Sequence, residues 1–144
     1  MKIYLDICCF NRPFDAQEQM RVRLETEAKL QIQGRIRHKR LKLVWSYMLD
    51  YENAANPFAE RKDAIAQWAV LAAMDVEENL FLLRKAAQLQ RLGIKAKDAL
   101  HLACALAAKC DYFLTTDRSL LKKATRLGDL RVMNPVDFFM TVIK

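Results

Sequence analysis

Two aspartates bracket the most apolar part of this sequence, the stretch from Asp98 to Asp117. Residues 99–108 are all apolar except His101, and a helix that is apolar nearly all round belongs inside a protein. Residues 112–116 are aromatic and β-branched, which predicts a buried strand that ends at Asp117. The stretch therefore predicts one carboxylate in the first turn of a buried helix and another at the end of a strand.

A third aspartate, Asp6, follows the strand predicted over Lys2–Leu5. The carboxyl ends of parallel strands meet at one edge of a sheet, where open α/β folds bind their ligands. Carboxylates gathered there repel one another by a few kcal/mol at ~4 Å, and a divalent cation removes that repulsion. Hard, oxygen-preferring Mg²⁺ or Mn²⁺ suits such a site and activates water for phosphodiester hydrolysis.

Each of these aspartates also has an ordinary structural explanation. Asp6 can simply end a strand, Asp98 can stabilise a helix N-terminus by roughly 0.3–1 kcal/mol, and Asp117 can cap a helix that begins at Ser119. The convergence of Asp6 and Asp117 on one sheet edge favours a site over three separate structural roles.

The elements that would position these acids alternate between strands and helices. This order predicts one α/β domain over residues 1–144, with a parallel sheet flanked by helices. The expected strands are Lys2–Leu5, 41–45, 112–116 and Leu130–Met133. The first expected helix runs from a capping box at Asp15 and Glu18 to Gly34, and the second covers 47–53. A third starts at Asn56-Pro57 and reaches Ala73, and two more cover 77–92 and 119–126. The last starts at Asn134-Pro135.

Composition excludes several classes of protein. With 144 residues, 53% of them apolar and 28% charged, the chain is globular and not disordered. No apolar stretch approaches the ~20 residues of a membrane span, and Asp6 interrupts any signal peptide, which predicts a cytoplasmic protein without membrane contact. Its three glycines cannot form a phosphate-binding glycine loop. The four cysteines form no C-x-x-C pair and are expected to be reduced, packed thiols.

The net charge of +7 has two interpretations. Basic residues are densest in the segment 35–42, called the basic block below, and others lie near the acids at Lys95, Lys97, Lys122, Lys123 and Arg126. They either form a solvated surface or attract a phosphate backbone, and composition alone does not choose between the two.

At this point several motifs resemble the PIN-domain family, the metal-dependent ribonucleases that include VapC-type toxins. They run in order along essentially the whole chain. They are Tyr4-Leu5-Asp6, Ser46 followed by Glu52, Lys97-Asp98-Ala99-Leu100-His101-Leu102-Ala103, Phe113-Leu114-Thr115-Thr116-Asp117 and Asn134-Pro135-Val136-Asp137-Phe138-Phe139.

The resemblance implies a catalytic quartet around Mg²⁺ or Mn²⁺, made of Asp6, Glu52, Asp98 and Asp117. Glu52 is preferred for its spacing after Ser46, although Asp50 lies two residues away. On a helix those two side chains point about 200° apart, so only one of them faces a metal. His101 lies on the same helix face as Asp98 and is interpreted as a buried hydrogen-bonding residue in preference to a ligand.

The resemblance further implies a metal-dependent endoribonuclease that cuts single-stranded or structured RNA, the toxin of a type II toxin–antitoxin pair with a cognate antitoxin. It leaves open whether the chain forms a homodimer. The sequence departs from the family where Thr or Ser, often followed by Asn, usually comes after the first aspartate, because Ile7 and Cys8 stand there. That departure keeps a second hypothesis open, a PIN-like module that binds RNA or protein without catalysis. A phospho-accepting receiver domain fits less well, because Ile7 replaces the adjacent acid that receivers need.

Overall fold

The computed structural model describes residues 1–143 and contains one six-stranded sheet in the order β3-β2-β1-β4-β6-β5. All neighbouring strands are parallel except β5 and β6, which are antiparallel. The prediction of an α/β fold with a parallel sheet flanked by helices is confirmed. The strands are β1 (Lys2–Leu5), β2 (Lys42–Ser46), β3 (Met74–Val76), β4 (Tyr112–Leu114), β5 (Arg126–Leu127) and β6 (Leu130–Met133).

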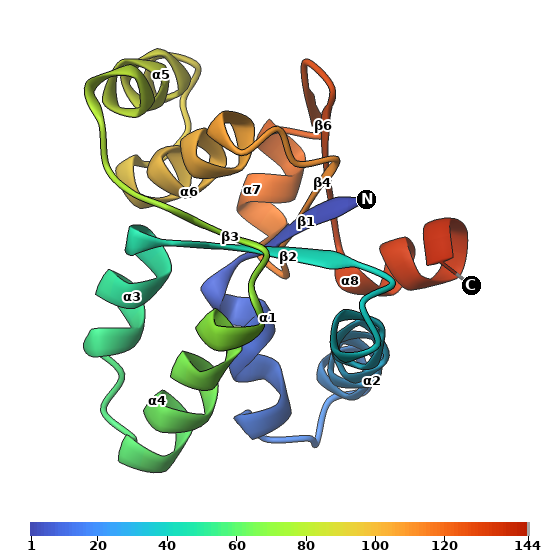
Figure 1. Cartoon of the computed structure of the whole chain (residues 1–144). Coiled ribbons are helices and arrows are strands. Elements are labelled where there is room, and N and C mark those ends of the chain that lie inside the picture. Colours follow the sequence, from blue (N-terminus) through green and yellow to red (C-terminus); the bar gives the residue numbers. More distant parts are fainter. Residues whose placement is uncertain (144) are drawn as a thin grey trace.

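Helices cover both faces of the sheet, with α5, α6 and α7 on one side and α1, α2, α3 and α4 on the other (Figure 1). Their bounds are α1 (Ile7–Asn11), α2 (Met20–Arg37), α3 (Tyr47–Ala54), α4 (Ala59–Ala66), α5 (Leu80–Arg91), α6 (Ala96–Ala107), α7 (Arg118–Lys123) and α8 (Pro135–Phe138). Short 3-10 turns η1 (Arg12–Phe14) and η2 (Gln67–Leu71) and the π-helical turn η3 (Phe139–Ile143) complete the described chain.

The three central strands explain why the sheet folds as it does. Helices cover both faces, so β1, β2 and β4 carry continuous apolar runs instead of alternating ones. Their core side chains are fully buried and include Tyr4, Trp45 and Phe113, with the Tyr4 and Phe113 rings stacked at 5.2 Å between centroids. As expected for an apolar helix, α6 is buried over its middle, at Ala99 and from His101 to Ala105, while its two ends are exposed. The four cysteines are free thiols, and three of them are buried.

Strand register brings three chain segments to one edge of the sheet. Leu5 of β1 pairs with Leu114 of β4, and Tyr4 pairs with Val44 of β2. The backbone N–H of Asp6 continues this ladder by donating to the carbonyl of Leu114 at 2.9 Å. The residues that follow β1, β2 and β4 therefore emerge together at the carboxyl edge.

The predicted start and end of the long helix after Asp15 are wrong. Asp15 caps no helix, because its carboxylate binds Arg12 at 2.8 Å and Arg61 at 3.6 Å. The helix α2 begins only at Met20, and it continues past Gly34, since a glycine with no tertiary constraint is tolerated inside a helix.

The predicted helix that starts at Asn56-Pro57 and reaches Ala73 is also wrong in extent. Asn56 accepts a hydrogen bond from the N–H of Phe58 in a turn, α4 starts at Ala59, and the chain then passes through η2 into the strand β3. The next helix, α5, starts at Leu80 because the Asn79 side chain caps it at Leu82, not at residue 77. In the part of the chain that the structure describes, no helix is long and apolar enough to cross a membrane.

Candidate active site

A cavity of about 440 Å³ opens at the carboxyl edge of the sheet, and four carboxylates line it. They come from four separate segments: Asp6 follows β1, Glu52 lies on α3, Asp98 lies in the first turn of α6, and Asp117 precedes α7. The structure therefore brings all four residues of the predicted quartet to one cavity, here called the acidic pocket.

Asp6 is the most buried of these acids, with 5% of its surface exposed. One carboxylate oxygen accepts the N–H of Ile7 at 2.8 Å and so caps α1, and the other accepts the hydroxyl of Thr115 at 2.9 Å. Burial raises the pKa of Asp6 above its usual range, while His101 and the Thr115 hydroxyl oppose that rise. Both oxygens are thus fixed in orientation by neighbours that favour the ionised form.

Thr115 supplies the hydroxyl that the sequence lacks after Asp6. The residue after Asp6 is Ile7, which has no hydroxyl and packs partly buried against the core. The hydroxyl instead reaches Asp6 from the end of β4, and Thr115 Oγ1 also accepts the N–H of Asp117 at 3.1 Å. The Cys8 thiol lies on the same side, 3.6 Å from the Asp6 carboxylate and 3.5 Å from Thr115.

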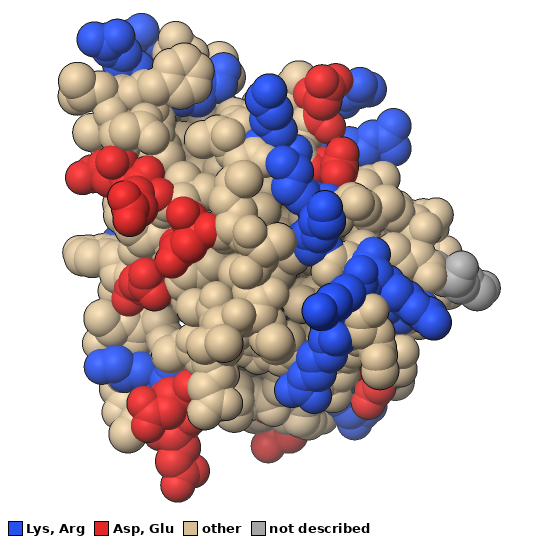
Figure 2. All heavy atoms as spheres, viewed as in Figure 1, with Lys and Arg blue, Asp and Glu red and all other residues tan. Residues whose placement is uncertain are grey.

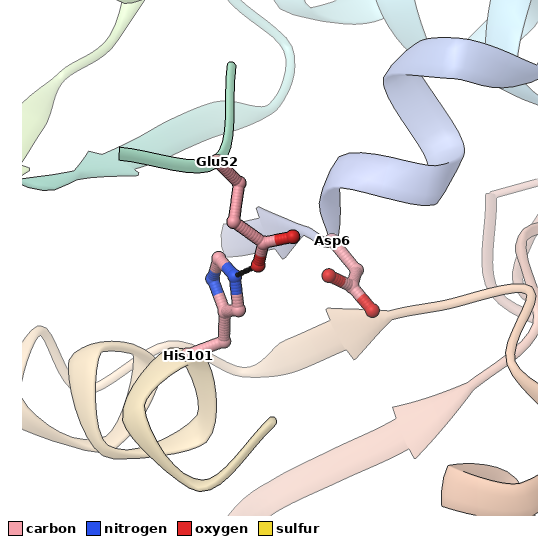
Figure 3. Close-up of side chains that lie close together, drawn as sticks. All are labelled: Asp6, Glu52 and His101. Atoms are coloured by element: carbon pink, nitrogen blue, oxygen red, sulfur yellow. Dashed lines mark hydrogen bonds and ion pairs between the residues drawn. The ribbon is translucent and has the colours of Figure 1, made fainter. Parts of the chain in front are cut away.

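Glu52 is held by a buried hydrogen-bonded chain. His101, with none of its surface exposed, binds Glu52 through Nε2, and its Nδ1 lies 2.5 Å from the Tyr4 hydroxyl. The Tyr4 hydroxyl in turn lies 2.6 Å from Ser46 Oγ. Figure 3 shows His101 reaching up from α6 to Glu52, whose carboxylate faces Asp6.

Which of these groups can donate and which can accept sets the direction of the hydrogen bonds from Tyr4 through His101 to Glu52. An ionised carboxylate only accepts, so His101 Nε2–H donates to Glu52 and its Nδ1 is left to accept the hydroxyl proton of Tyr4. Burial raises the pKa of Tyr4 well above its usual value, so the phenol keeps that proton. Both ring nitrogens of His101 are engaged, which confirms the interpretation of His101 as a buried hydrogen-bonding residue.

The choice of Glu52 over Asp50 agrees with where the two side chains lie. Asp50 accepts a hydrogen bond from the indole N–H of Trp45 at 2.8 Å and is not among the residues that line the acidic pocket. Glu52 lines the pocket with its side chain 20% exposed.

Asp98 and Asp117 complete the rim of the pocket. Burial and the nearby charges of Asp6 and Asp117 raise the pKa of Asp98 to about 6. Asp117 keeps the structural role considered above, because its Oδ1 accepts the N–H groups of Ser119 at 2.9 Å and Leu120 at 3.2 Å. The carboxylates of Asp98, Asp6 and Asp117 repel one another, and a bound cation would remove this repulsion.

The donor set fits a hard divalent cation. Ligand atoms of Asp6, Glu52 and His101 all lie within 4.8 Å of one another, and since His101 is engaged, the two carboxylates are the available ligands of that cluster. Asp98 and Asp117 are not part of this tightest group but line the same cavity. Four carboxylates line the pocket against a single thiol, that of Cys8, and this excess of hard oxygen donors favours Mg²⁺ or Mn²⁺ over softer metals.

Positive charge lies both beside the pocket and at the opposite edge of the sheet. Lys95 and Lys97 line the acidic pocket at the start of α6. The basic block instead spans the end of α2 and the start of β2, and Lys42 pairs with Lys2 at the amino edge. Figure 2 shows basic side chains crowded toward the amino ends of the strands and several acidic ones on the other side.

The fold is similar to two solved structures. The structure of VapBC2 from Rickettsia felis, bound to a DNA fragment from its promoter, matches with a TM-score of 0.55 and 14% identity over 93% of this chain and 98% of that chain. The fold is VapC-like. VapBC-1 from nontypeable Haemophilus influenzae matches this VapC-like PIN-domain fold with a TM-score of 0.53 and 14% identity, over 94% of this chain and 98% of that chain. No protein-family model and no curated protein sequence matches the chain.

Proposed function

We propose that this protein is a metal-dependent endoribonuclease that hydrolyses RNA phosphodiester bonds. The observation that carries the proposal is the acidic pocket, in which Asp6, Glu52, Asp98 and Asp117 converge from four segments with Lys95 and Lys97 beside them. Carboxylates that hold a cation, next to lysines that bind phosphate oxygens, are the groups that metal-assisted phosphodiester hydrolysis needs.

The biological role we propose is that of the toxin of a type II toxin–antitoxin pair. Support comes from the likeness to VapBC structures, which suggests a cognate antitoxin as partner of this chain. If so, expression of the chain alone should arrest growth, and co-expression of a short neighbouring reading frame should restore it. Growth arrest that persists when the Asp98→Asn variant is expressed would show that toxicity does not depend on the acidic pocket.

The residues of the chain have distinct tasks in this proposal. Mg²⁺ or Mn²⁺, held by Asp6, Glu52, Asp98 and Asp117, would lower the pKa of a bound water and stabilise charge on the phosphate. His101 and Thr115 orient Glu52 and Asp6 through the hydrogen bonds described above. Lys95 and Lys97 hold the RNA backbone by charge.

The decisive experiment compares Asp98→Asn with Asp50→Asn in cleavage of single-stranded RNA with Mn²⁺. Asn is close in size to Asp and is also favoured at helix starts, so the fold should survive both changes. Loss of a metal ligand should slow cleavage on the order of a hundredfold or more, since each ~1.36 kcal/mol is tenfold in rate. Asp50→Asn should cleave like the wild type, because the Asn oxygen can still accept the Trp45 N–H.

Two outcomes would contradict the proposal. Equal cleavage by wild type and Asp98→Asn would assign the activity to a contaminant or another site. An inert wild type that still binds RNA or a protein partner would favour a binding module, the role that Ile7 after Asp6 left open.

A further inference from the structure

A second cavity, of about 600 Å³, lies between α2, η1 and the segment from α4 to η2. It shares no lining residue with the acidic pocket. Its walls are largely apolar and aromatic and include Phe10, Phe14, Ile65, Trp68 and Leu71. Volumes of roughly 300–1,000 Å³ with mostly apolar walls are typical of small-molecule sites.

One stripe of α2 supplies hydrogen-bond donors to this cavity. Lys29, Gln33 and Arg37 all line it, and their four-residue spacing places them one above another on the same helix face. Lysine and arginine are donors only, and the amide of Gln33 contributes two more N–H groups. The stripe therefore presents two basic side chains and an amide to a cavity with apolar walls.

These three side chains have no hydrogen-bond or ion-pair partner among residues 1–143. Lys29 is 2% exposed and Gln33 is 6% exposed, and neither has a polar atom that is both fully buried and unpaired, so their donors face the open space of the cavity. A ligand in the cavity that accepts hydrogen bonds would therefore find these donors accessible and without a protein partner among the described residues.

Aromatic rings are what the two cations contact. The Lys29 ammonium lies 5.3 Å from the Phe10 ring centroid and 5.4 Å from that of Trp68, and the Arg37 guanidinium lies 5.0 Å from the Trp68 centroid. The Trp68 ring is thus in contact with both cations, and no carboxylate within residues 1–143 forms an ion pair with either of them. Burial, with Arg37 nearby, lowers the pKa of Lys29 to about 7, which is the response of an ammonium without a counter-ion.

We propose that this cavity binds a small organic acid, a carboxylate carried on an aromatic or aliphatic body. The carboxylate would accept hydrogen bonds from Lys29, Gln33 and Arg37, and the apolar body would lie against Phe10, Trp68 and Leu71. Charge complementarity selects the carboxylate, and the aromatic walls select the body. This binding site is independent of the proposed nuclease activity.

The test titrates the purified full-length protein with phenylbutyrate and, as the neutral match, with phenylbutanol. Binding is followed by two-dimensional NMR of the Trp68 indole N–H and the Gln33 side-chain amide. Phenylbutyrate should shift both signals and bind at least about tenfold more tightly than phenylbutanol, as a charge-assisted hydrogen bond implies.

Three variants assign this preference to the stripe. Lys29→Met keeps an unbranched side chain without charge and should abolish the preference for the acid. Arg37→Met, at an exposed position where folding is not at risk, should reduce the preference at least about threefold. Arg40→Met removes an arginine of the basic block that does not line the cavity and should leave binding unchanged.

Several results would overturn the proposal. Equal affinity for acid and alcohol, or no binding of either at millimolar concentration, would show that the stripe does not select a carboxylate. Shifts confined to Lys95 and Lys97 would move the acid to the other pocket. If both Lys29→Met and Arg37→Met still bind the acid more tightly than the alcohol, the acid does not bind at this site. Should Lys29→Met fail to fold, an unchanged preference in Arg37→Met alone rules the site out.

Discussion

His101 and Glu52 are joined by a hydrogen bond that links the buried helix α6 to the carboxylate facing Asp6. The two residues lie 49 positions apart in the sequence, so their hydrogen bond links α3 to α6. Because His101 is itself fixed by Tyr4, the orientation of Glu52 is set by the core of the protein and not by solvent.

Removing this hydrogen bond should reduce catalysis more than RNA binding. In His101→Phe, Glu52 loses its donor and the Tyr4 hydroxyl loses its acceptor, so we expect kcat to fall roughly tenfold or more and the free energy of unfolding to fall by about 1–3 kcal/mol. Tyr4→Phe is the control, because it keeps the bond between His101 and Glu52 and should affect kcat less. Cleavage kinetics and urea denaturation measure the two effects, and equal kcat values for both variants would argue against a role in orienting Glu52.

The hydroxyl of Thr115 should matter for metal binding. Thr115→Val keeps the shape of the side chain but removes the donor to Asp6 Oδ2, so we expect Mn²⁺ affinity to fall by roughly tenfold. Thr115→Ser retains the hydroxyl and should bind Mn²⁺ like the wild type. Calorimetric titration decides the matter, and an unchanged affinity in Thr115→Val would mean that Asp6 needs no second anchor.

Mn²⁺ or Mg²⁺ should raise the melting temperature of the protein. A cation that binds only the folded chain stabilises it by mass action, and the shift should vanish in the double variant Asp6→Asn with Asp98→Asn. Asp50→Asn, outside the pocket, should keep the full shift. Thermal scans at a series of metal concentrations provide the measurement, and a shift that survives in the double variant would place the cation elsewhere.

The lysines beside the acidic pocket, and not the basic block, should dominate the binding of short RNA. The basic block lies at the amino edge of the sheet, whereas Lys95 and Lys97 line the pocket itself. On a single strand the slope of log affinity against log salt is about −0.7 per phosphate contacted, so Lys95→Gln with Lys97→Gln should flatten it. Replacing Arg35, Arg37 and Arg40 with Gln should leave the slope unchanged, and a flatter slope there would establish the basic block as part of the RNA site.

The stability of the fold should rise with pH through Lys29. Its pKa is about 7 when folded and 10.5 when free, so between these values the unfolded chain binds more protons than the folded chain. The free energy of unfolding should therefore increase with pH in this window, by up to about 1.4 kcal/mol per unit. Lys29→Met should remove this slope. Urea denaturation between about pH 6.5 and 7.5 tests it below the range in which the buried thiols and Tyr4 oppose the trend.

Much of the fold was predictable because its central elements have strong patterns. The apolar run of α6 and the aromatic residues of β4 identified the elements that carry Asp98 and precede Asp117. The short helix α3, with Ser46 as its cap, placed Glu52. Because these segments are buried, the same packing contacts determine both which residues occupy them and which structure they form.

The errors fell where tertiary contacts override local preference. The helix α1 (Ile-Cys-Cys-Phe-Asn) has no strong helix former, and it begins because Asp6 caps it. The three-residue strand β3 joins the sheet only through pairing with β2. Asp15 looked like a cap because its bond to Arg61 comes from the distant helix α4 and leaves no trace in the local sequence. The bond from Thr115 to Asp6 spans 109 positions and left no local signal.

The position of β1 between β2 and β4 has a consequence for protein synthesis. Of the strands in this sheet, β1 leaves the ribosome first, and one of its two neighbours is made of residues 112–114. A nascent chain that lacks β4 has Asp6 without the Thr115 hydroxyl and without Asp117. The acidic pocket therefore cannot be complete until residue 117 has left the exit tunnel of the ribosome, which delays activity until well after β1 and β2 have emerged.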